Sequence, residues 1–273
     1  MACSDSDYAY LRQLVLTESA NVIDPSRNSL FDARLRPVAR LAGARDLEGL
    51  VDLLRVDDTT RLHRAVAEAM TINETSFFRD VAPFEALRKT VIPALIRQNE
   101  VSRTMRVWSA ACSTGQEAYS VSMLLLEHFP ELLQWDVQIV GTDISGQVVE
   151  YATQGRYRRI EVNRGLPAKL LVKYMVRDGD EWEVVTGVRD RCRFVQGNLC
   201  AALPELPRFD LVLLRNVLLY FPQQDRRALF AMVAKQMRLG GYLLLGNAEQ
   251  AEDSTSLFTP EFADNCYFYR PVE

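Results

Sequence analysis

The sequence predicts an α/β protein, in which a doubly wound, mostly parallel sheet follows a small all-helical region. From Met105 onward, short apolar runs that suit buried strands alternate with segments whose apolar residues recur at helical spacing. Before that point the spacing is helical only. Strands that alternate with helices form parallel sheets covered on both faces. The chain has 273 residues, of which 48% are hydrophobic and 25% charged, so it is long enough for one or two such domains.

A helical region precedes the polar-aromatic segment Thr71–Asp80, which joins it to the rest of the chain. Apolar side chains such as Leu30, Phe31 and Leu35 recur at steps of three and four residues along the helical region. We therefore expect a helical domain over residues 1–75 and a larger α/β domain over residues 76–273.

The α/β domain is expected to contain several buried strands. We predict them at Met105–Ala111, Val137–Thr142, Cys192–Gln196, Leu211–Arg215 and Tyr242–Gly246, with a last strand at Asn265–Arg270 that adds antiparallel near an edge. The pair Gly240-Gly241 is predicted to cap the helix that precedes the fifth strand. Residues from about 155 to 191 are too long for a helical crossover, and Asp178-Gly179 suggests a hairpin turn within them. We expect a small antiparallel sheet to be inserted there.

Composition narrows the class of protein. The formal charge of −4 argues against nucleic acid as a partner, and no apolar run is long enough to span a membrane. Residues 1–7 are polar and are not typical of an export signal. The five cysteines show no CxxC spacing, which favours reduced thiols in the cytoplasm. With only His63 and His128 present, neither a histidine-rich metal site nor a Ser-His-Asp triad is expected.

The stretch from Arg106 to Ser120, RVWSAACSTGQEAYS, reads as a strand, a turn of small residues and the start of a helix. In α/β sheets this arrangement binds nucleotide-like cofactors. An ordinary strand-to-helix turn is the alternative interpretation of this stretch taken alone.

Polar residues that follow successive strands favour a nucleoside cofactor, because ligands collect at the carboxyl ends of parallel strands. Glu117 lies at the start of the helix that follows the first strand. Asp143, after the second strand, is placed to accept hydrogen bonds from the hydroxyls of a ribose. Asn198 with a neighbouring backbone N–H could bind an adenine edge, and Arg215–Tyr220 follows the fourth strand. Because GxGxxG and GxxxxGK[ST] are absent, S-adenosylmethionine fits better than NAD or ATP.

At these positions the sequence resembles the chemotaxis receptor glutamate methyltransferases of the CheR type over nearly its whole length. The matching stretches are TINETSFFRD at 71–80, WSAACSTGQEAYS at 108–120, VGTDIS at 140–145, QGNL at 196–199, LRNVLLYF at 214–221 and LGGYLLLGNAE at 239–249. The resemblance implies a helical domain and a class I S-adenosylmethionine-dependent methyltransferase domain that carries an antiparallel insertion. It also implies methyl transfer to glutamate side chains in the cytoplasmic helices of chemoreceptors.

The resemblance implies roles for individual residues. Those implied to line the cofactor pocket are Asn73, Thr75, Arg79, Ala111, Glu117, Asp143, Asn198, Leu199, Asn216 and Val217. Arg79 and Tyr220 would lie nearest the transferred methyl group and act as catalytic residues. Arg34, Arg36 and Arg40 would contact the receptor, although a stripe of this kind is more often a solvated face.

The sequence departs from the family pattern at a few positions. Ala118 and Gln116 replace residues that are frequent in the family, and neither is expected to touch the cofactor. The loop around Arg177–Glu183 is short, so the chain resembles members that do not depend on a receptor pentapeptide. We expect a cytoplasmic monomer without a metal and without membrane insertion.

A glutamate substrate suits a sequence with only two histidines, because its carboxylate is ionised at neutral pH and needs no general base. We expect Arg79 to orient a carboxylate, Tyr220 to donate a hydrogen bond near the methyl group, and Phe77, Phe78 and Leu219 to exclude water. Core packing is an equally good reading of the two phenylalanines. A non-catalytic module that binds S-adenosylmethionine or S-adenosylhomocysteine, and a methyltransferase for another protein or a small molecule, are the alternatives.

Overall fold

The computed structural model describes residues 3–56, 60–251, 254 and 256–272. Its internal contacts divide the chain into two compact units. The first takes in the residues up to Ile72 together with Tyr220–Asp225, and the second takes in Asn73–Leu219 and the residues from Arg226 onward. Within the described residues, none of the helices combines the length and the apolar character that crossing a bilayer requires.

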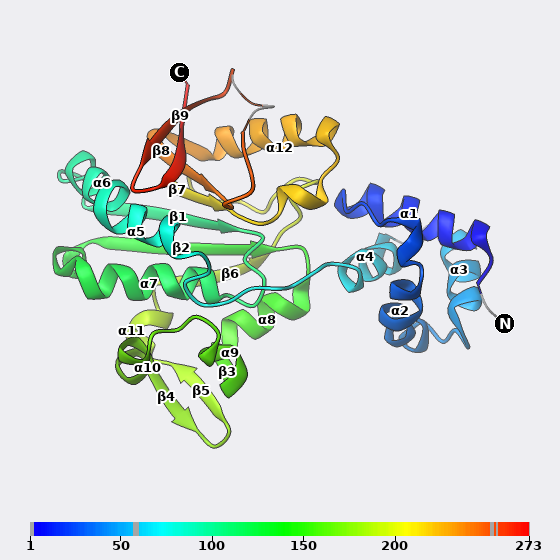
Figure 1. Ribbon diagram of the computed structural model, residues 1–273. Helices are drawn as coiled ribbons and strands as arrows, with labels where there is room; N and C mark the ends of the chain where they lie inside the picture. The colour runs from blue at the N-terminus through cyan, green and yellow to red at the C-terminus, as the bar shows by residue number, and fades with distance from the viewer. Residues whose placement is uncertain (1–2, 57–59, 252–253, 255, 273) are drawn as a thin grey trace. The chain divides into compact units, whose positions relative to one another are not determined.

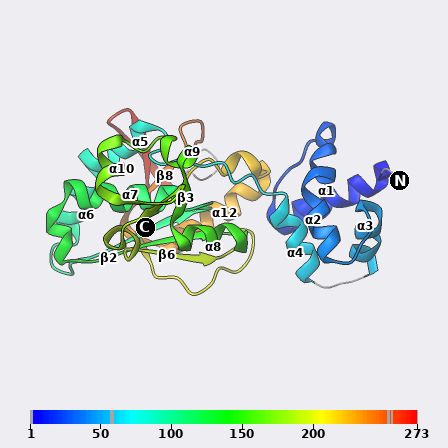
Figure 2. The same ribbon diagram turned by 90° about the horizontal axis from the view of Figure 1, so that it is seen from below.

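The first unit is helical, as the apolar spacing predicts (Figures 1 and 2). Its helices are α1 (Asp5–Ser19), α2 (Ser29–Leu41), α3 (Leu47–Val56) and α4 (Thr60–Ala69), with a 3-10 turn, η1, at Pro25–Arg27. The side chain of Ser4 caps α1 by accepting the N–H of Asp7 at 3.2 Å. The core is formed by fully buried apolar side chains, among them Leu11, Phe31 and Leu35.

The second unit is built on a sheet whose strand order is β6-β2-β1-β7-β8-β10-β9. The strands are β1 (Thr104–Ala110), β2 (Asp136–Asp143), β6 (Cys192–Gln196), β7 (Phe209–Leu214), β8 (Met237–Leu245), β9 (Phe258–Ala263) and β10 (Cys266–Pro271). β6, β2, β1, β7 and β8 pair in parallel, and β10 pairs antiparallel with both β8 and β9. The doubly wound sheet and its antiparallel last strand are therefore confirmed, and β9 is an additional edge strand.

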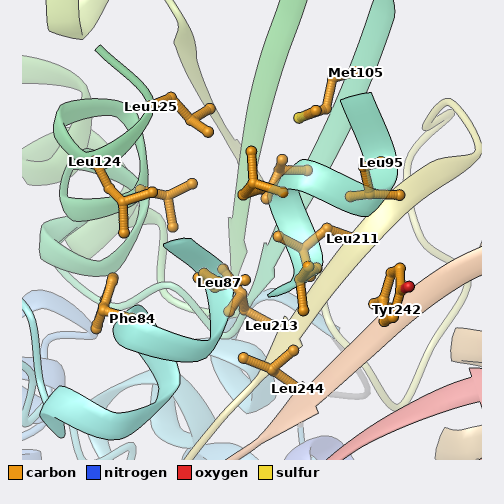
Figure 3. Close-up of a cluster of buried hydrophobic side chains, with 14 of the residues drawn as sticks. Phe84, Leu87, Leu95, Met105, Leu124, Leu125, Leu211, Leu213, Tyr242 and Leu244 are labelled. Carbon is orange, nitrogen blue, oxygen red and sulfur yellow. The ribbon is translucent and has the colours of Figure 1, made fainter. Parts of the chain in front are cut away.

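Helices cover this sheet. They are α5 (Val81–Ala86), a π-helical segment η2 (Leu87–Val91), α6 (Ile92–Gln98), α7 (Gln116–His128), α8 (Gly146–Gln154) and α12 (Gln223–Gln236), with 3-10 turns η3 (Pro130–Gln134) and η4 (Leu218–Tyr220). On one face, Leu87 and Leu125 meet Met105, Leu211 and Leu244 in a continuous apolar core (Figure 3).

Alternate residues of the same strands point to the opposite face. Trp108 of β1 stacks on Phe209 at 5.3 Å between ring centroids, and its Nε1 donates to Oγ1 of Thr142 at 2.9 Å. Because Trp108, Val212 and Leu243 alternate with residues of the core on the other face and are fully buried, the sheet is covered on both faces.

An antiparallel subdomain is inserted between β2 and β6, as predicted. Its elements are β3 (Arg156–Arg158), α9 (Arg159–Asn163), α10 (Ala168–Tyr174), β4 (Met175–Asp178), β5 (Glu181–Val184) and α11 (Thr186–Arg189), and its strand order is β3-β5-β4. A tight turn joins β4 and β5 (Figure 1). Gly179 and Asp180 form it, and the φ of +61° at Gly179 explains the glycine.

The prediction for Gly240-Gly241 is wrong. α12 ends at Gln236, and both glycines lie inside β8, where the register with β7 shifts between Phe209 and Leu211. A Cβ at Gly241 would lie 3.0 Å from the carbonyl oxygen of Asp210, so only glycine allows this approach. The pair therefore accommodates a β-bulge rather than ending a helix.

Glu127 connects the inserted subdomain to α7. Its carboxylate accepts hydrogen bonds from Lys169 Nζ at 2.8 Å, Lys173 Nζ at 2.5 Å and the hydroxyl of Tyr174 at 3.1 Å. The bonds from the two lysines lower the pKa of Glu127 to about 2. A carboxyl whose pKa is lowered in the folded state stabilises the fold above its unfolded pKa and loses this effect as the pH falls towards the folded pKa.

We expect Glu127→Gln to lower the free energy of unfolding by about 1 kcal/mol at pH 7, since solvent screens the two exposed lysines. The difference from the unmodified chain should shrink as the pH falls from about 4.5 towards 2. Urea denaturation at pH 7 and at pH 3.5 measures it. Glu131→Gln, at an exposed position of η3, is the control. An equal effect of Glu127→Gln at both pH values would contradict the prediction.

Candidate functional site

The candidate site lies where β1, β2, β6 and β7 end. These strands are neighbours and run parallel, so the segments that follow them meet at one edge of the sheet (Figure 1). The chain passes from β1 to β2 on one side, and later to β7 on the other side of β1. Such a reversal of strand order leaves a crevice at the carboxyl ends of the strands, which is the usual ligand site of this architecture.

The turn after β1 is made of small residues in unusual backbone conformations. Ala111 and Ser113 have φ values of +58° and +50°, and Gly115 has a φ of +91°. Ser113 joins two other segments, because its N–H donates to Oδ2 of Asp143 at 2.8 Å and its Oγ donates to the carbonyl of Asn73 at 2.9 Å. Left-handed conformations at residues other than glycine are rare and cluster at functional sites.

Asp143 ends β2 and is buried, with its residue only 6% exposed. Its two carboxylate oxygens accept the backbone N–H groups of Ser113 at 2.8 Å and Ser145 at 3.1 Å. These two bonds fix the carboxylate at the end of β2, and its contact with the hydroxyls of a ribose stays a prediction.

Asn198 and Leu199 follow β6 and are half-buried. Oδ1 of Asn198 accepts the N–H of Cys200 at 2.9 Å, and the N–H of Gly197 donates to the carbonyl of Asp143 at 2.9 Å. The loop after β6 is therefore tied to the end of β2.

The segment 73–80 reaches the same edge from outside the sheet. Nη1 of Arg79 donates to the carbonyl of Glu74 at 2.9 Å, which closes the segment on itself. The N–H of Phe78 donates to Oγ of Ser120 on α7 at 2.9 Å. Asn73 is exposed and Thr75 and Arg79 are half-buried, so side chains of this segment are accessible to a ligand.

Arg215 joins this segment to the sheet. Its side chain is only 1% exposed, and its Nη1 donates to Oε2 of Glu117 at 2.9 Å. Its Nη2 donates to the carbonyl of Arg79 at 2.6 Å and to Oδ2 of Asp80 at 3.1 Å. The other oxygen of Glu117 accepts the hydroxyl of Ser109 at 2.7 Å. One guanidinium thus fixes the end of β7, the start of α7 and the segment 73–80 in one arrangement.

Two further atoms define the electrostatics of the site. Nε of Arg215 is buried and has no hydrogen-bond partner among the described residues.

Burial, and next the charges of Asp143 and Glu117, raise the pKa of the Cys112 thiol well above its usual value. Cys112 therefore stays protonated at neutral pH. A protonated thiol is a poor nucleophile, because the reactive form is the thiolate.

The model of the family "CheR methyltransferase, SAM binding domain" matches residues 73–266. The chain belongs to this family. It is 35% identical over 254 residues to "Chemotaxis protein methyltransferase 1" of Pseudomonas aeruginosa, which covers 91% of this chain and 92% of that protein. It is 30% identical over 272 residues to "Chemotaxis protein methyltransferase 2" of Vibrio cholerae, which covers 98% of this chain and 94% of that protein. The resemblance in the sequence is confirmed, and S-adenosylmethionine is the cofactor of the matched domain.

In this CheR-family chain the residues predicted to line the pocket fall on a few connected segments. The residues at or just after the four strand ends that meet at one edge are Ala111, Glu117, Asp143, Asn198 and Asn216. Contact of each residue with the cofactor stays a prediction. For Glu117 the geometry adds a role, because both oxygens of its carboxylate are engaged by Ser109 and Arg215.

Tyr220 is placed differently from the other predicted residues. It ends the turn η4 and is grouped with the helical unit, where its carbonyl accepts the N–H of Val22 at 3.2 Å. Val217, three residues earlier, belongs to the α/β unit. The pairing of Tyr220 with Arg79 beside the methyl group stays a prediction.

The three arginines of α2 are not equivalent. Arg34 is half-buried and donates its Nη1 to the carbonyl of Thr71 at 2.6 Å. Arg36 and Arg40 are exposed and lie four residues apart, so they share one face of the helix. These two are the arginines whose side chains are available to a partner.

The list of predicted residues omits two that organise the site. Arg215 stands directly after the apolar run of β7, and the sequence places it among the polar residues that follow the fourth strand, but without a role in the site. Glu249 lies beyond β8, and its carboxylate accepts the N–H groups of Asn216 and Leu218. Nothing in the local sequence pattern indicates that Glu249 reaches the loop after β7.

Proposed function

We propose that this protein transfers the methyl group of S-adenosylmethionine to glutamate side chains in the cytoplasmic helices of chemoreceptors. The observation that carries the proposal is the joining of segments 73–80, 111–117 and 215–217 through Arg215, in a chain of the CheR family. The proteins of P. aeruginosa and V. cholerae described above are named as chemotaxis protein methyltransferases and match nearly the full length of the chain. We place this activity in the cytoplasm.

The residues present suit S-adenosylmethionine. The turn 111–115 has small side chains and a single glycine, which suits a nucleoside without a diphosphate. The buried Nε of Arg215 lacks an acceptor among the described residues, and a buried donor of this kind is costly to leave unpaired. A ligand carboxylate would supply such an acceptor. In the proposal, Asp143 holds the ribose hydroxyls, Asn198 and Leu199 hold the adenine, and Asn73, Thr75, Ala111, Asn216 and Val217 complete the pocket.

Bound there, S-adenosylmethionine supplies an electrophilic methyl group on a sulfonium. The substrate glutamate is ionised at neutral pH, so the protein need not remove a proton from it. What the chain must contribute is position and the exclusion of water. Arg79 orients a carboxylate, and Tyr220 donates a hydrogen bond near the methyl group.

The side chains that were expected to exclude water divide into two kinds. Phe77 is fully buried and packs edge-on against Tyr157 at 5.1 Å, so its role is core packing. Phe78 is half-buried against Phe84, and Leu219 is 58% exposed. Phe78 and Leu219 are therefore the ones that can close over a substrate.

The exposed face of α2 is the proposed receptor contact. We expect the double variant Arg36→Glu/Arg40→Glu to raise the KM for a receptor cytoplasmic fragment by about tenfold at low salt, because charge complementarity is reversed. The Kd for S-adenosylhomocysteine should stay unchanged. Raising the ionic strength should reduce the difference, since the Debye length falls to about 3 Å at 1 M salt.

Arg27→Glu/Arg45→Glu is a matched control, because it makes the same charge change at exposed positions outside α2. A similar rise in KM for both double variants would show that net charge, and not the face of α2, determines receptor affinity.

The proposed activity is tested by incubating the protein with labelled S-adenosylmethionine and purified receptor cytoplasmic domains. Glutamyl methyl esters release methanol in base, so base-labile label on the receptor is the expected result. Cofactor binding without transfer to several receptor domains would overturn the proposal. Transfer to another protein or to a small molecule would reassign the substrate. If Arg79→Ala left signalling unchanged while cofactor binding stayed essential, a non-catalytic binding module would replace the enzyme.

A further inference from the structure

Glu249 lies in the turn after β8 and is half-buried. Its Oε2 accepts the N–H of Asn216 at 2.7 Å and the N–H of Gly246 at 2.8 Å, and its Oε1 accepts the N–H of Leu218 at 2.8 Å. Hydrogen bonds to an ionised acceptor are about twice as strong as those between neutral groups. One carboxylate therefore ties together the loops that follow β7 and β8.

Asn216 has an uncommon backbone conformation. Its φ is +58°, in the left-handed region that few residues other than glycine adopt and that asparagine tolerates better than most. In this conformation its N–H points at Glu249. The N–H of Leu218 binds the same carboxylate, so Val217 lies between two fixed amides.

Gly246 shows how closely the two loops approach each other. A Cβ at this position would lie 2.7 Å from Oε2 of Glu249 and 2.9 Å from both the backbone N and Nδ2 of Asn216. No larger residue fits there without moving one of the loops, so the glycine and the carboxylate form one closely packed unit.

We propose that Glu249 is a positioning residue for the methyltransferase reaction, and that it sets the conformation of Asn216 and Val217 for binding S-adenosylmethionine. The inference rests on the proposed placement of the cofactor at these two residues. Glu249 acts through the three backbone amides and not by contact with the reacting atoms. Its loss should therefore weaken cofactor binding more than receptor binding.

The test compares Glu249→Gln with Glu261→Gln, which makes the same charge change at an exposed position of β9. A glutamine amide presents an NH2 group to one of the N–H donors, so at least one hydrogen bond is lost. We expect the Kd for S-adenosylhomocysteine, measured by calorimetry, to rise by about tenfold or more in Glu249→Gln and to stay unchanged in Glu261→Gln. The KM for the receptor fragment should change less than twofold.

A second readout does not depend on activity or on a ligand. The amide proton and nitrogen shifts of Asn216 and Leu218 should move in Glu249→Gln, while amides elsewhere in β7 and β8 keep theirs. Glu249→Asp, whose side chain is shorter, should give an intermediate Kd. A purely structural role would lower the melting temperature without this selective pattern.

The outcomes separate this inference from the proposed site. If Asn216→Ala weakens S-adenosylhomocysteine binding but Glu249→Gln leaves both the Kd and the amide shifts unchanged, Glu249 is not a positioning residue and the site stands. If Glu249→Gln weakens binding but Asn216→Ala does not, Glu249 does not act through Asn216. If neither variant alters the Kd, both the inference and the placement of the cofactor at Asn216 are wrong.

Discussion

Gly165→Ala is expected to lower the free energy of unfolding by about 3 kcal/mol or more, the range typical of strain added at a special backbone position. Gly165 has a φ of +95°, and a Cβ there would lie only 2.0 Å from the carbonyl oxygen of Phe77. Because the nearest atom belongs to the backbone, it cannot turn aside as a flexible side chain would. The steric clash and the strained φ therefore both lower the stability of the folded state, and their effects add. A melting curve checks the result, with a fall of about 6–12 °C expected for a chain of this size.

The same substitution should also weaken S-adenosylhomocysteine binding. Gly165 lies between α9 and α10 of the inserted subdomain, and its neighbour Arg164 forms an ion pair with Glu74. This contact lowers the pKa of Glu74, chiefly through the hydrogen bond from Arg164. The inserted subdomain thus contacts the segment 73–80 at Glu74 and at the buried Phe77, and we expect movement of Phe77 to displace Thr75 and Arg79 with it.

Gly179→Ala is the matched control, because Gly179 also has a positive φ, of +61°, but no atom lies within 4 Å of the added Cβ. Gly179→Ala should lower the free energy of unfolding by only about 1 kcal/mol, the cost of placing alanine in this backbone conformation. Equal melting temperatures for the two variants would show that the close contact between Gly165 and Phe77 does not persist in solution.

Arg215→Met should have the largest effect on activity. It removes the guanidinium that binds Glu117, Asp80 and the carbonyl of Arg79, and it leaves two carboxylates near the sheet without their cation. Breaking a buried ion pair from one side costs about 3–5 kcal/mol. This cost falls on the stability of the fold. Separately, we expect kcat/KM to fall about 100-fold or more, because the segment 73–80 and the start of α7 lose their common anchor; such a fall corresponds to about 2.7 kcal/mol of lost transition-state stabilisation. Steady-state kinetics with a receptor fragment measures this loss.

Two further variants show whether the network or the charge is responsible. Arg215→Lys keeps the charge but cannot make several hydrogen bonds in a fixed plane, so it should recover little activity. Adding Glu117→Gln to Arg215→Met removes one unpaired charge and should recover part of the lost stability. Arg88→Met is the control, because Arg88 forms a half-exposed ion pair with Glu85 away from the site, and such pairs contribute little to stability. Full activity of Arg215→Lys would contradict the network described here.

Much of the fold followed from local patterns. The apolar runs of β1 and β7 and the Asp-Gly turn of the inserted hairpin are recognisable from a few neighbouring residues. The family followed from longer stretches such as NETSFFR and RNVLLYF, and the matched family confirms it. Where a local pattern had two explanations, as at Gly240-Gly241, the sequence alone pointed to the wrong one, because a C-cap and a β-bulge both favour glycine.

The sequence by itself determined the fold class, the family and the segments that carry the candidate site, because each depends on residues that are close together in the chain. Only the tertiary structure decided what those residues contact. Arg215 and Asp80 are 135 positions apart, and Asn216 and Glu249 are 33 positions apart. Such pairs form because β7 lies beside β1 on one side and β8 on the other, and no local periodicity encodes that neighbourhood. The partners of a buried charge are therefore a property of strand order.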